Sequence, residues 1–162
     1  MKKIFTVLFL IMVLTACSDT TNKDSKSETT KKDTSSEATE HNYQFIGESE
    51  HWEAVYSYKG TELWGEDDGQ ITHSSKDKYK LVLTYKGSLE ELSSIKNLKY
   101  SYETTTSSGS KTEEYTEPPS EKVFTIGGGS ENGAIVGEGE VIKVNVKWDG
   151  FKESFELHNK DK

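Results

Sequence analysis

The densest group of metal-ligating side chains in the sequence is an acidic turn. Glu66, Asp67 and Asp68 are followed directly by Gly69. Carboxylate oxygens are hard ligands that suit Ca²⁺, but the segment lacks the alternating DxDxDG spacing and the distal Glu of an EF-hand loop. We interpret it as a solvated turn that uses the backbone preferences of Asp-Gly. The sequence therefore predicts no metal site, and the nearest candidate ligands are Asp67 and Asp68.

The other reactive side chains do not form a motif. The histidines lie far apart, without the HExxH or HxH spacing of a zinc site; they are His41, His51, His73 and His158. No GxSxG elbow presents a serine nucleophile, and the glycine-rich segments 127–130 and 133–139 lack the GxxxxGK[ST] pattern of a phosphate-binding loop. We predict no catalytic residue and no cofactor, although histidines gathered only by folding would escape this test.

Aromatic side chains offer a different chemistry, which is stacking against a sugar ring. The chain contains six Phe, three Trp and eight Tyr. Most of those after residue 42 fall on predicted inward faces of strands, where core packing explains them. Trp64 lies beside the acidic turn and outside any clear strand pattern. We therefore name Trp64 as the candidate ligand-binding residue.

The start of the chain has the pattern of an exported protein. Met1-Lys2-Lys3 is cationic, and the apolar run 4–14 is too short for a bilayer span, which needs about 20 residues. The run ends in Leu14-Thr15-Ala16-Cys17, which looks like the lipobox of bacterial lipoproteins. In that family the cysteine receives a diacylglyceryl group and becomes the new N-terminus. The pattern predicts a lipoprotein signal peptide over 1–16 and lipid attachment, including palmitate, at Cys17.

Residues 17–42 are predicted to be the lipidated cysteine followed by a disordered tether. From Ser18 to Asn42 there is no aromatic and no branched aliphatic residue, so the segment has nothing with which to form a core. Two acyl chains on Cys17 give a stable anchor, whereas one chain binds a membrane reversibly. We expect attachment to the outer face of the cell membrane without a spanning helix.

Charge excludes two classes of partner. All 20 basic residues are Lys, and the formal net charge is −8. An acidic protein without guanidinium groups is poorly suited to nucleic acid or to electrostatic binding of anionic lipid. The lipid on Cys17 must then supply the membrane binding. The exclusive use of Lys is also typical of AT-rich genomes and favours a Gram-positive source.

Alternation of apolar and polar residues predicts that residues 43–162 form one all-β domain. Short strands are expected at 43–46, 122–126 and 134–136. The longer strands have inward sets at Trp52, Ala54, Tyr56 and Tyr58, at Tyr79, Leu81, Leu83 and Tyr85, and at Leu98, Tyr100 and Tyr102.

The clearest local pattern is a C-terminal hairpin. Asp149-Gly150 lies between two alternating runs and suits a two-residue type I′ turn. This turn places Trp148, Val146, Val144 and Ile142 opposite Phe151, Glu153, Phe155 and Leu157, respectively. We expect the apolar members of these pairs to face the core together.

One helix competes with the strands. Ser88-Leu89-Glu90-Glu91 fits a capping box and predicts about two helical turns, with Leu89, Leu92 and Ile95 facing the sheet. With seven to nine short strands, the predicted architecture is a two-sheet antiparallel sandwich, immunoglobulin-like in general form.

Three segments together resemble a group of small Firmicute, Bacillus-like lipoproteins. They are Phe45-Ile46-Gly47-Glu48-Ser49-Glu50-His51-Trp52, with its G-E-S-x-x-W strand start, Leu83-Thr84-Tyr85-Lys86-Gly87, and Val146-Lys147-Trp148-Asp149-Gly150 with its W-D-G hairpin. The resemblance implies lipid anchoring and an all-β domain. It implies no activity and no catalytic residue.

The leading functional hypothesis is a non-catalytic binding or interaction module at the cell envelope. One alternative is a cell-wall-acting enzyme or enzyme subunit that uses a carboxylate pair, and a buried pair of Glu or Asp in one cleft would favour it. Another is a structural envelope protein. The partner, whether a protein or a cell-wall polymer, is not defined by the sequence.

Overall fold

The computed structural model of the protein describes residues 36–162. The predicted signal peptide 1–16, Cys17 and most of the predicted tether lie outside this range. Within it, no helix is long and apolar enough to cross a membrane.

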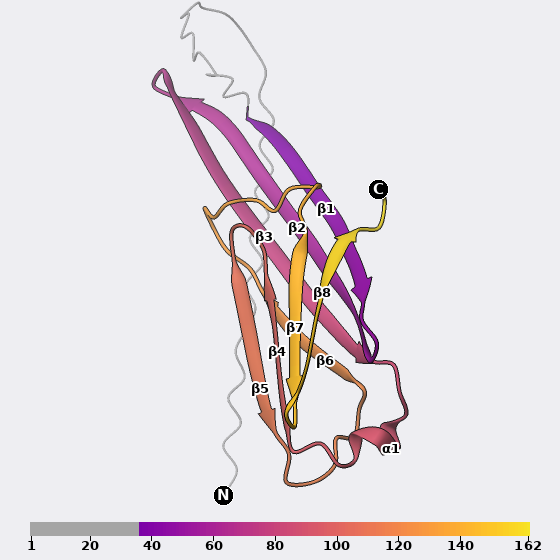
Figure 1. Cartoon of the computed structure of the whole chain (residues 1–162). Coiled ribbons are helices and arrows are strands. Elements are labelled where there is room, and N and C mark those ends of the chain that lie inside the picture. The colour runs from indigo at the N-terminus through magenta and orange to yellow at the C-terminus, as the bar shows by residue number, and fades with distance from the viewer. Residues whose placement is uncertain (1–35) are drawn as a thin grey trace, which may run out of the picture. The chain divides into compact units, whose positions relative to one another are not determined.

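The described chain is all-β, as predicted, with eight antiparallel strands and one short helix (Figure 1). The elements are β1 (Glu37–Glu48), β2 (Trp52–Asp67), β3 (Gln70–Tyr85), α1 (Leu89–Leu92), β4 (Asn97–Glu103), β5 (Ser108–Glu114), β6 (Val123–Gly128), β7 (Ile142–Trp148) and β8 (Phe151–Asn159).

The strands form one sheet in the order β5-β4-β7-β8-β1-β2-β3-β6, and its edge strands β5 and β6 approach each other. The result is a nearly closed, barrel-like sheet rather than the predicted immunoglobulin-like sandwich of two separate sheets. The two halves are joined by a short pairing of β1 with β8, at Phe45 with Asn159 and Ile46 with His158. A period-two pattern indicates which face of each strand is buried, but not which strands pair. The sequence therefore does not predict the pairing of β1 with β8.

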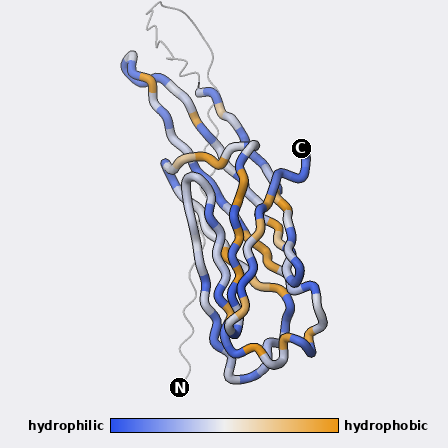
Figure 2. The backbone as a smooth tube through the Cα atoms, in the orientation of Figure 1, coloured by the Kyte–Doolittle hydropathy of each residue, from blue (hydrophilic) through white to orange (hydrophobic). Residues whose placement is uncertain are grey.

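The barrel interior is the core, and it confirms the predicted inward faces. Every member of the β2 set and the β4 set is buried, and on β3 only Tyr79 is partly exposed. β7 adds Ile142, Val144 and Val146. Figure 2 shows most of the hydrophobic segments along the barrel strands, whereas the projecting ends of β2 and β3 are mainly hydrophilic or neutral.

Three strands extend beyond their predicted ends. β1 begins at Glu37, and residues 37–42 pair with β2, so the end of the predicted tether belongs to the sheet. β2 and β3 continue to a turn at Asp68-Gly69, where both residues have positive φ. These extensions are held by backbone pairing with exposed side chains, and therefore leave no apolar pattern in the sequence.

β5 was not predicted, because its sequence is almost entirely polar. Lys111 and Glu113 on this edge strand form an ion pair. The Tyr100 hydroxyl lies 3.0 Å from Glu113 Oε1 and 3.2 Å from the carbonyl oxygen of Thr125 on β6. The Tyr100 side chain therefore connects β5 and β6 across the seam between these two edge strands, where no backbone pairing forms. The expected strand 134–136 is irregular instead, although Val136 is buried.

The C-terminal hairpin has the predicted register throughout. Asp149 and Gly150 have φ values of 41° and 92°, as a type I′ turn requires. The prediction for Phe151 is wrong: its side chain is 65% exposed, because the hairpin tip extends past the core. The helix is also shorter than expected, one turn capped by Ser88, and Leu89 is largely exposed.

Candidate functional site

One end of the barrel contains a partly enclosed cavity walled by tyrosine rings. Its volume is about 270 Å³, just below the range of roughly 300–1,000 Å³ that is usual for ligand pockets. Tyr56 and Tyr58 come from β2, Tyr79 from β3 and Tyr102 from β4, and Asp77 lies at the rim. Strand alternation places all four rings on the inner face of the sheet.

The rings are held against each other and against glycines. The Tyr56 and Tyr79 rings stack with centroids 5.6 Å apart, and the Tyr102 ring lies 5.2 Å from that of Tyr56. Tyr102 pairs across strands with Gly109, where a Cβ atom would lie 2.6 Å from the Tyr102 ring. Gly128 faces Tyr79 in the same way. The two edge strands therefore need glycine here to admit the rings.

The segment 129–141 closes this end of the barrel. The Asp77 carboxylate accepts hydrogen bonds from the Ser130 N–H at 3.0 Å and from its hydroxyl at 2.8 Å. Ser75 donates to the carbonyl of Gly133 at 2.6 Å, and the Val136 N–H donates to the Tyr58 hydroxyl at 3.2 Å. Segment 129–141 is therefore held to β2 and β3 at three points.

Two hydroxyls in this wall have no such partner. The Tyr56 and Tyr102 side chains are buried, yet their hydroxyl oxygens find no hydrogen-bond partner within residues 36–162. Burial raises the pKa of both phenols, with the neighbouring tyrosines adding to the effect and Ser107 opposing it at Tyr102, so both stay neutral and can donate or accept. Leaving a buried polar group unsatisfied costs about 1–3 kcal/mol.

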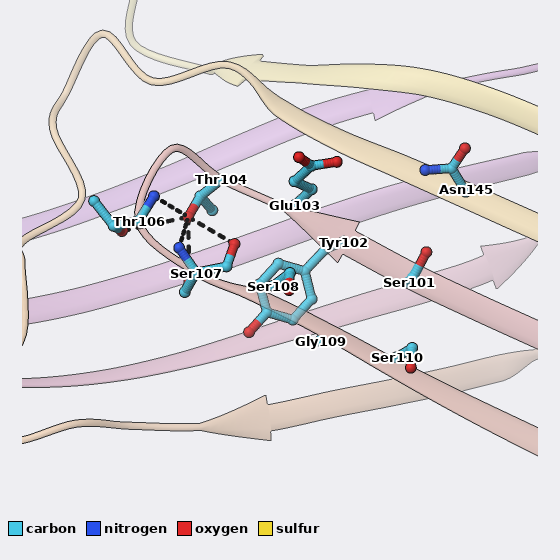
Figure 3. Close-up of a pocket in the computed structure, with 10 residues that line it drawn as sticks. All are labelled: Ser101, Tyr102, Glu103, Thr104, Thr106, Ser107, Ser108, Gly109, Ser110 and Asn145. Atoms are coloured by element: carbon cyan, nitrogen blue, oxygen red, sulfur yellow. Dashed lines mark hydrogen bonds between the residues drawn. The ribbon is translucent and has the colours of Figure 1, made fainter.

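An open polar depression adjoins the cavity (Figure 3). Thr104 organises the β4–β5 turn there, because its hydroxyl accepts the backbone N–H groups of Thr106 and Ser107 at 3.2 and 2.8 Å. The outer face beside this turn carries a cross-strand row of small polar side chains, Ser110, Ser101 and Asn145. The turn itself lines both the depression and the cavity, so it forms the boundary between them.

The residues singled out from the sequence do not line this cavity. Trp64 lies in β2 and is 46% exposed, with its ring centroid 4.3 Å from that of His73. Asp67 ends β2 and Asp68 forms the turn. Among the described residues, three possible metal ligands converge elsewhere, at Glu50, His51 and Glu153.

Folding gathers three of the four histidines into contacts that their spacing did not reveal. His41 and His73 both contact the carboxylate of Glu62, at 2.9 and 3.1 Å, and hydrogen bonds from them hold the pKa of Glu62 below its usual range. His51 Nδ1 lies 2.5 Å from Glu153 Oε1. These contacts join neighbouring strands, and only a correct strand order would have predicted them.

The buried carboxylate pair expected of a cell-wall enzyme is not found in residues 36–162, whose buried polar residues are Ser75, Thr104 and Asn159. The lipidation residue Cys17 lies outside the described range. No protein-family model, curated protein or solved structure gives a significant match to the chain.

Proposed function

We propose that the protein is a lipid-anchored, non-catalytic ligand-binding module on the outer face of the cell membrane. The lipobox-like segment ending at Cys17 supports the anchor, and so does the resemblance to small Firmicute lipoproteins. Residues between Cys17 and the start of β1 act as a tether that holds the barrel clear of the lipid head groups.

The tyrosine-lined cavity is the binding site in this proposal. The observation that carries it is the pair of buried, unpartnered hydroxyls on Tyr56 and Tyr102. Two other buried tyrosine hydroxyls do have partners: Tyr58, in the same cavity wall, accepts from Val136, and Tyr100 donates across the seam between β5 and β6. A small molecule that hydrogen-bonds to the two unpartnered groups would recover their desolvation cost on binding.

The cavity lining selects an uncharged, hydroxyl-bearing ligand of sugar size. None of the described residues that line it is Lys or His, so nothing there would neutralise an anion. Tyr79, the only one of the four rings that is partly exposed, offers a stacking surface, and the Asp77 carboxylate can accept from a ligand hydroxyl. The small volume fits one monosaccharide unit better than an extended polymer.

Ligand binding is tested by titrating the full chain carrying Cys17→Ser with glucose and N-acetylglucosamine, with tetramethylammonium and phosphate as charged comparisons. Tyrosine ring resonances and the unfolding midpoint are followed. We expect a response to a sugar, weakened at least tenfold in the Tyr56→Phe/Tyr102→Phe double variant, since each lost hydrogen bond is worth about 1 kcal/mol. Tyr85→Phe, at the other end of the barrel, is the matched control. Failure of both sugars, or equal binding by the double variant, would overturn the proposal.

The anchor is tested in the cell. Cys17→Ser should abolish palmitate labelling and release the protein from the membrane fraction or leave it unprocessed, because residues 36–162 contain no helix able to span a membrane. Retention of both label and membrane association in this variant would contradict the lipid anchor.

A further inference from the structure

A second polar cluster lies at the opposite end of the barrel, where the β1–β2 turn meets the β7–β8 hairpin. Ligand atoms of Glu50, His51 and Glu153 all lie within 4.8 Å of one another. Glu153 on β8 accepts from the Ser49 hydroxyl at 2.5 Å and from the His51 N–H at 3.2 Å, both at Oε2. Its Oε1 atom faces His51 Nδ1.

These contacts leave one member of the cluster without a structural role. Ser49 and His51 tie the turn to Glu153, but Glu50 is exposed and makes no hydrogen bond or ion pair with another described residue. Its carboxylate nevertheless faces the same imidazole. A purely structural ion pair between His51 and Glu153 does not require Glu50.

The surroundings favour an added positive charge. Carboxylates of Glu50, Glu91 and Glu153 all act electrostatically on His51. The nearby cation, Lys86, is already paired with Glu48 at 2.9 Å and with the Ser49 carbonyl oxygen at 3.0 Å. On the other side the imidazole is flanked by the Tyr85 and Trp148 rings, which hold its orientation.

We propose that Glu50, His51 and Glu153 form a binding site for Zn²⁺ that is distinct from the tyrosine-lined cavity. One imidazole and two carboxylates are a ligand set that zinc accepts, with a fourth position left for water. The imidazole argues against Ca²⁺ and Mg²⁺, which take oxygen ligands. The Ser49 hydroxyl supplies the outer hydrogen bond that orients the Glu153 carboxylate.

The decisive variant is Glu50→Gln, because it removes a metal ligand and leaves the Ser49, His51 and Glu153 contacts in place. The full chain carrying Cys17→Ser, which also removes the only thiol, is titrated with Zn²⁺ while the His51 ring resonances and the binding heat are recorded. Glu53→Gln changes an exposed carboxylate just beyond the turn and serves as the control. Ca²⁺ titration tests the predicted selectivity.

We expect Zn²⁺ to shift the His51 resonances, and Glu50→Gln to weaken this binding by about tenfold or more, since loss of even an outer-shell partner of a metal ligand costs about 10–100-fold in affinity. Glu53→Gln should stay within about twofold of the parent chain, as a surface charge should. Unmoved His51 resonances, equal affinity in Glu50→Gln, or Zn²⁺ binding that is lost only with His73→Asn would each overturn the site. The last outcome would assign the metal to the His41, Glu62 and His73 cluster instead.

Discussion

The two ends of the barrel differ in how many of their polar side chains have hydrogen-bond partners within the chain. At the hairpin end, Glu153 accepts three hydrogen bonds, and the Asp149 carboxylate accepts the backbone N–H groups of Lys96 and Asn97 at 3.0 Å. At the tyrosine end, the Tyr56 and Tyr102 hydroxyls are buried without partners. The Glu153 and Asp149 carboxylates fasten strands together at the first end, although the buried Trp52 Nε1 there has no partner among the described residues. At the second end Asp77 and Ser75 hold segment 129–141, and of the buried side chains there only the two tyrosine hydroxyls lack a partner within residues 36–162.

This contrast distinguishes polar groups that stabilise the fold from polar groups that are available to a ligand. A group that completes its hydrogen bonds within the chain should be costly to remove, and an unpartnered buried group should be cheap to remove, because its desolvation cost has no compensation in the folded state. Substitutions at the two ends should therefore have opposite consequences for the free energy of unfolding.

The largest effect is expected for Glu153→Ala. The change leaves the Ser49 hydroxyl, the His51 N–H and the His51 ring without their acceptor, and a hydrogen bond to a charged group contributes about 1.5–3 kcal/mol, less where the donors can turn to water. We predict a loss of about 2–4 kcal/mol in urea-induced unfolding. Glu156→Ala, at an exposed position on the same strand, should cost less than about 1 kcal/mol. Similar losses of unfolding free energy in the two variants would mean that the Glu153 hydrogen bonds do not stabilise the fold.

A somewhat smaller loss is expected for Gly150→Val. The φ of 92° at the hairpin tip strongly disfavours a β-branched residue, and such strain costs about 1–3 kcal/mol. Gly137→Val is the matched control, since Gly137 has an ordinary φ and open space around its Cα atom. The midpoint temperature of thermal unfolding should fall clearly for Gly150→Val and stay close to that of the parent chain for Gly137→Val. A harmless Gly150→Val would contradict the type I′ turn.

Asp149→Asn should have only a small effect, because Asn-Gly suits the same turn and the amide oxygen can still accept from the Lys96 and Asn97 N–H groups. Asp149→Ala removes this acceptor and should cost about 1 kcal/mol more than Asp149→Asn in the same unfolding assay. Equal stability of the two variants would show that the carboxylate does not hold the start of β4.

The His51 and Glu153 pair makes the hairpin end sensitive to pH. The hydrogen bond to Glu153 raises the pKa of His51 above its ordinary 6.5, so its contribution is complete below 6.5 and is lost as pH rises through the raised pKa. Partial burial acts to raise the pKa of Glu153, but hydrogen bonds from Ser49 and His51 hold it below its ordinary 4.5. The contribution of Glu153 is therefore present above 4.5 and is lost as pH falls through the lowered pKa.

The pair should consequently stabilise the fold most between about pH 4.5 and 6.5. The measurement is the difference in unfolding free energy between the parent chain and His51→Asn, recorded with EDTA at pH 5.5 and at pH 8.5. We expect the difference to shrink at the higher pH. A constant difference would indicate that the ion pair does not form.

The sequence predicted those parts of the fold that depend on local patterns. Period-two alternation identified the buried faces of β2, β3 and β4, and Asp149-Gly150 determined the register of the last hairpin. The polar β5, the paired segment 37–42 and the nearly closed single sheet escaped prediction, since backbone pairing without an apolar face leaves no periodic signal.

Neither candidate site could be predicted in the same way. The predicted core includes Tyr56, Tyr79 and Tyr102, and they do pack there, but the cavity depends on contacts between β4 and the adjacent pair β2 and β3, from which β4 is separated in the sheet. Glu153 was read only as a partner of Val146, whereas its contacts with Ser49 and His51 span more than 100 residues. Trp64 is the sequence-based candidate because it lies beside the acidic turn and outside any clear strand pattern, yet the structure places it within β2 on the projecting hairpin.

The most direct test of the account compares two tyrosine hydroxyls that differ only in having a partner. Tyr58→Phe removes the acceptor of the Val136 N–H and should destabilise the ligand-free protein by about 1 kcal/mol, the usual value of one buried hydrogen bond. Tyr56→Phe removes an unpartnered hydroxyl and should leave stability unchanged or raise it by up to about 1 kcal/mol. Urea unfolding of the two variants beside the parent chain gives both values. If Tyr56→Phe destabilises the protein as much as Tyr58→Phe, the Tyr56 hydroxyl already has a partner in the folded state, and the tyrosine-lined cavity is not a binding site awaiting its ligand.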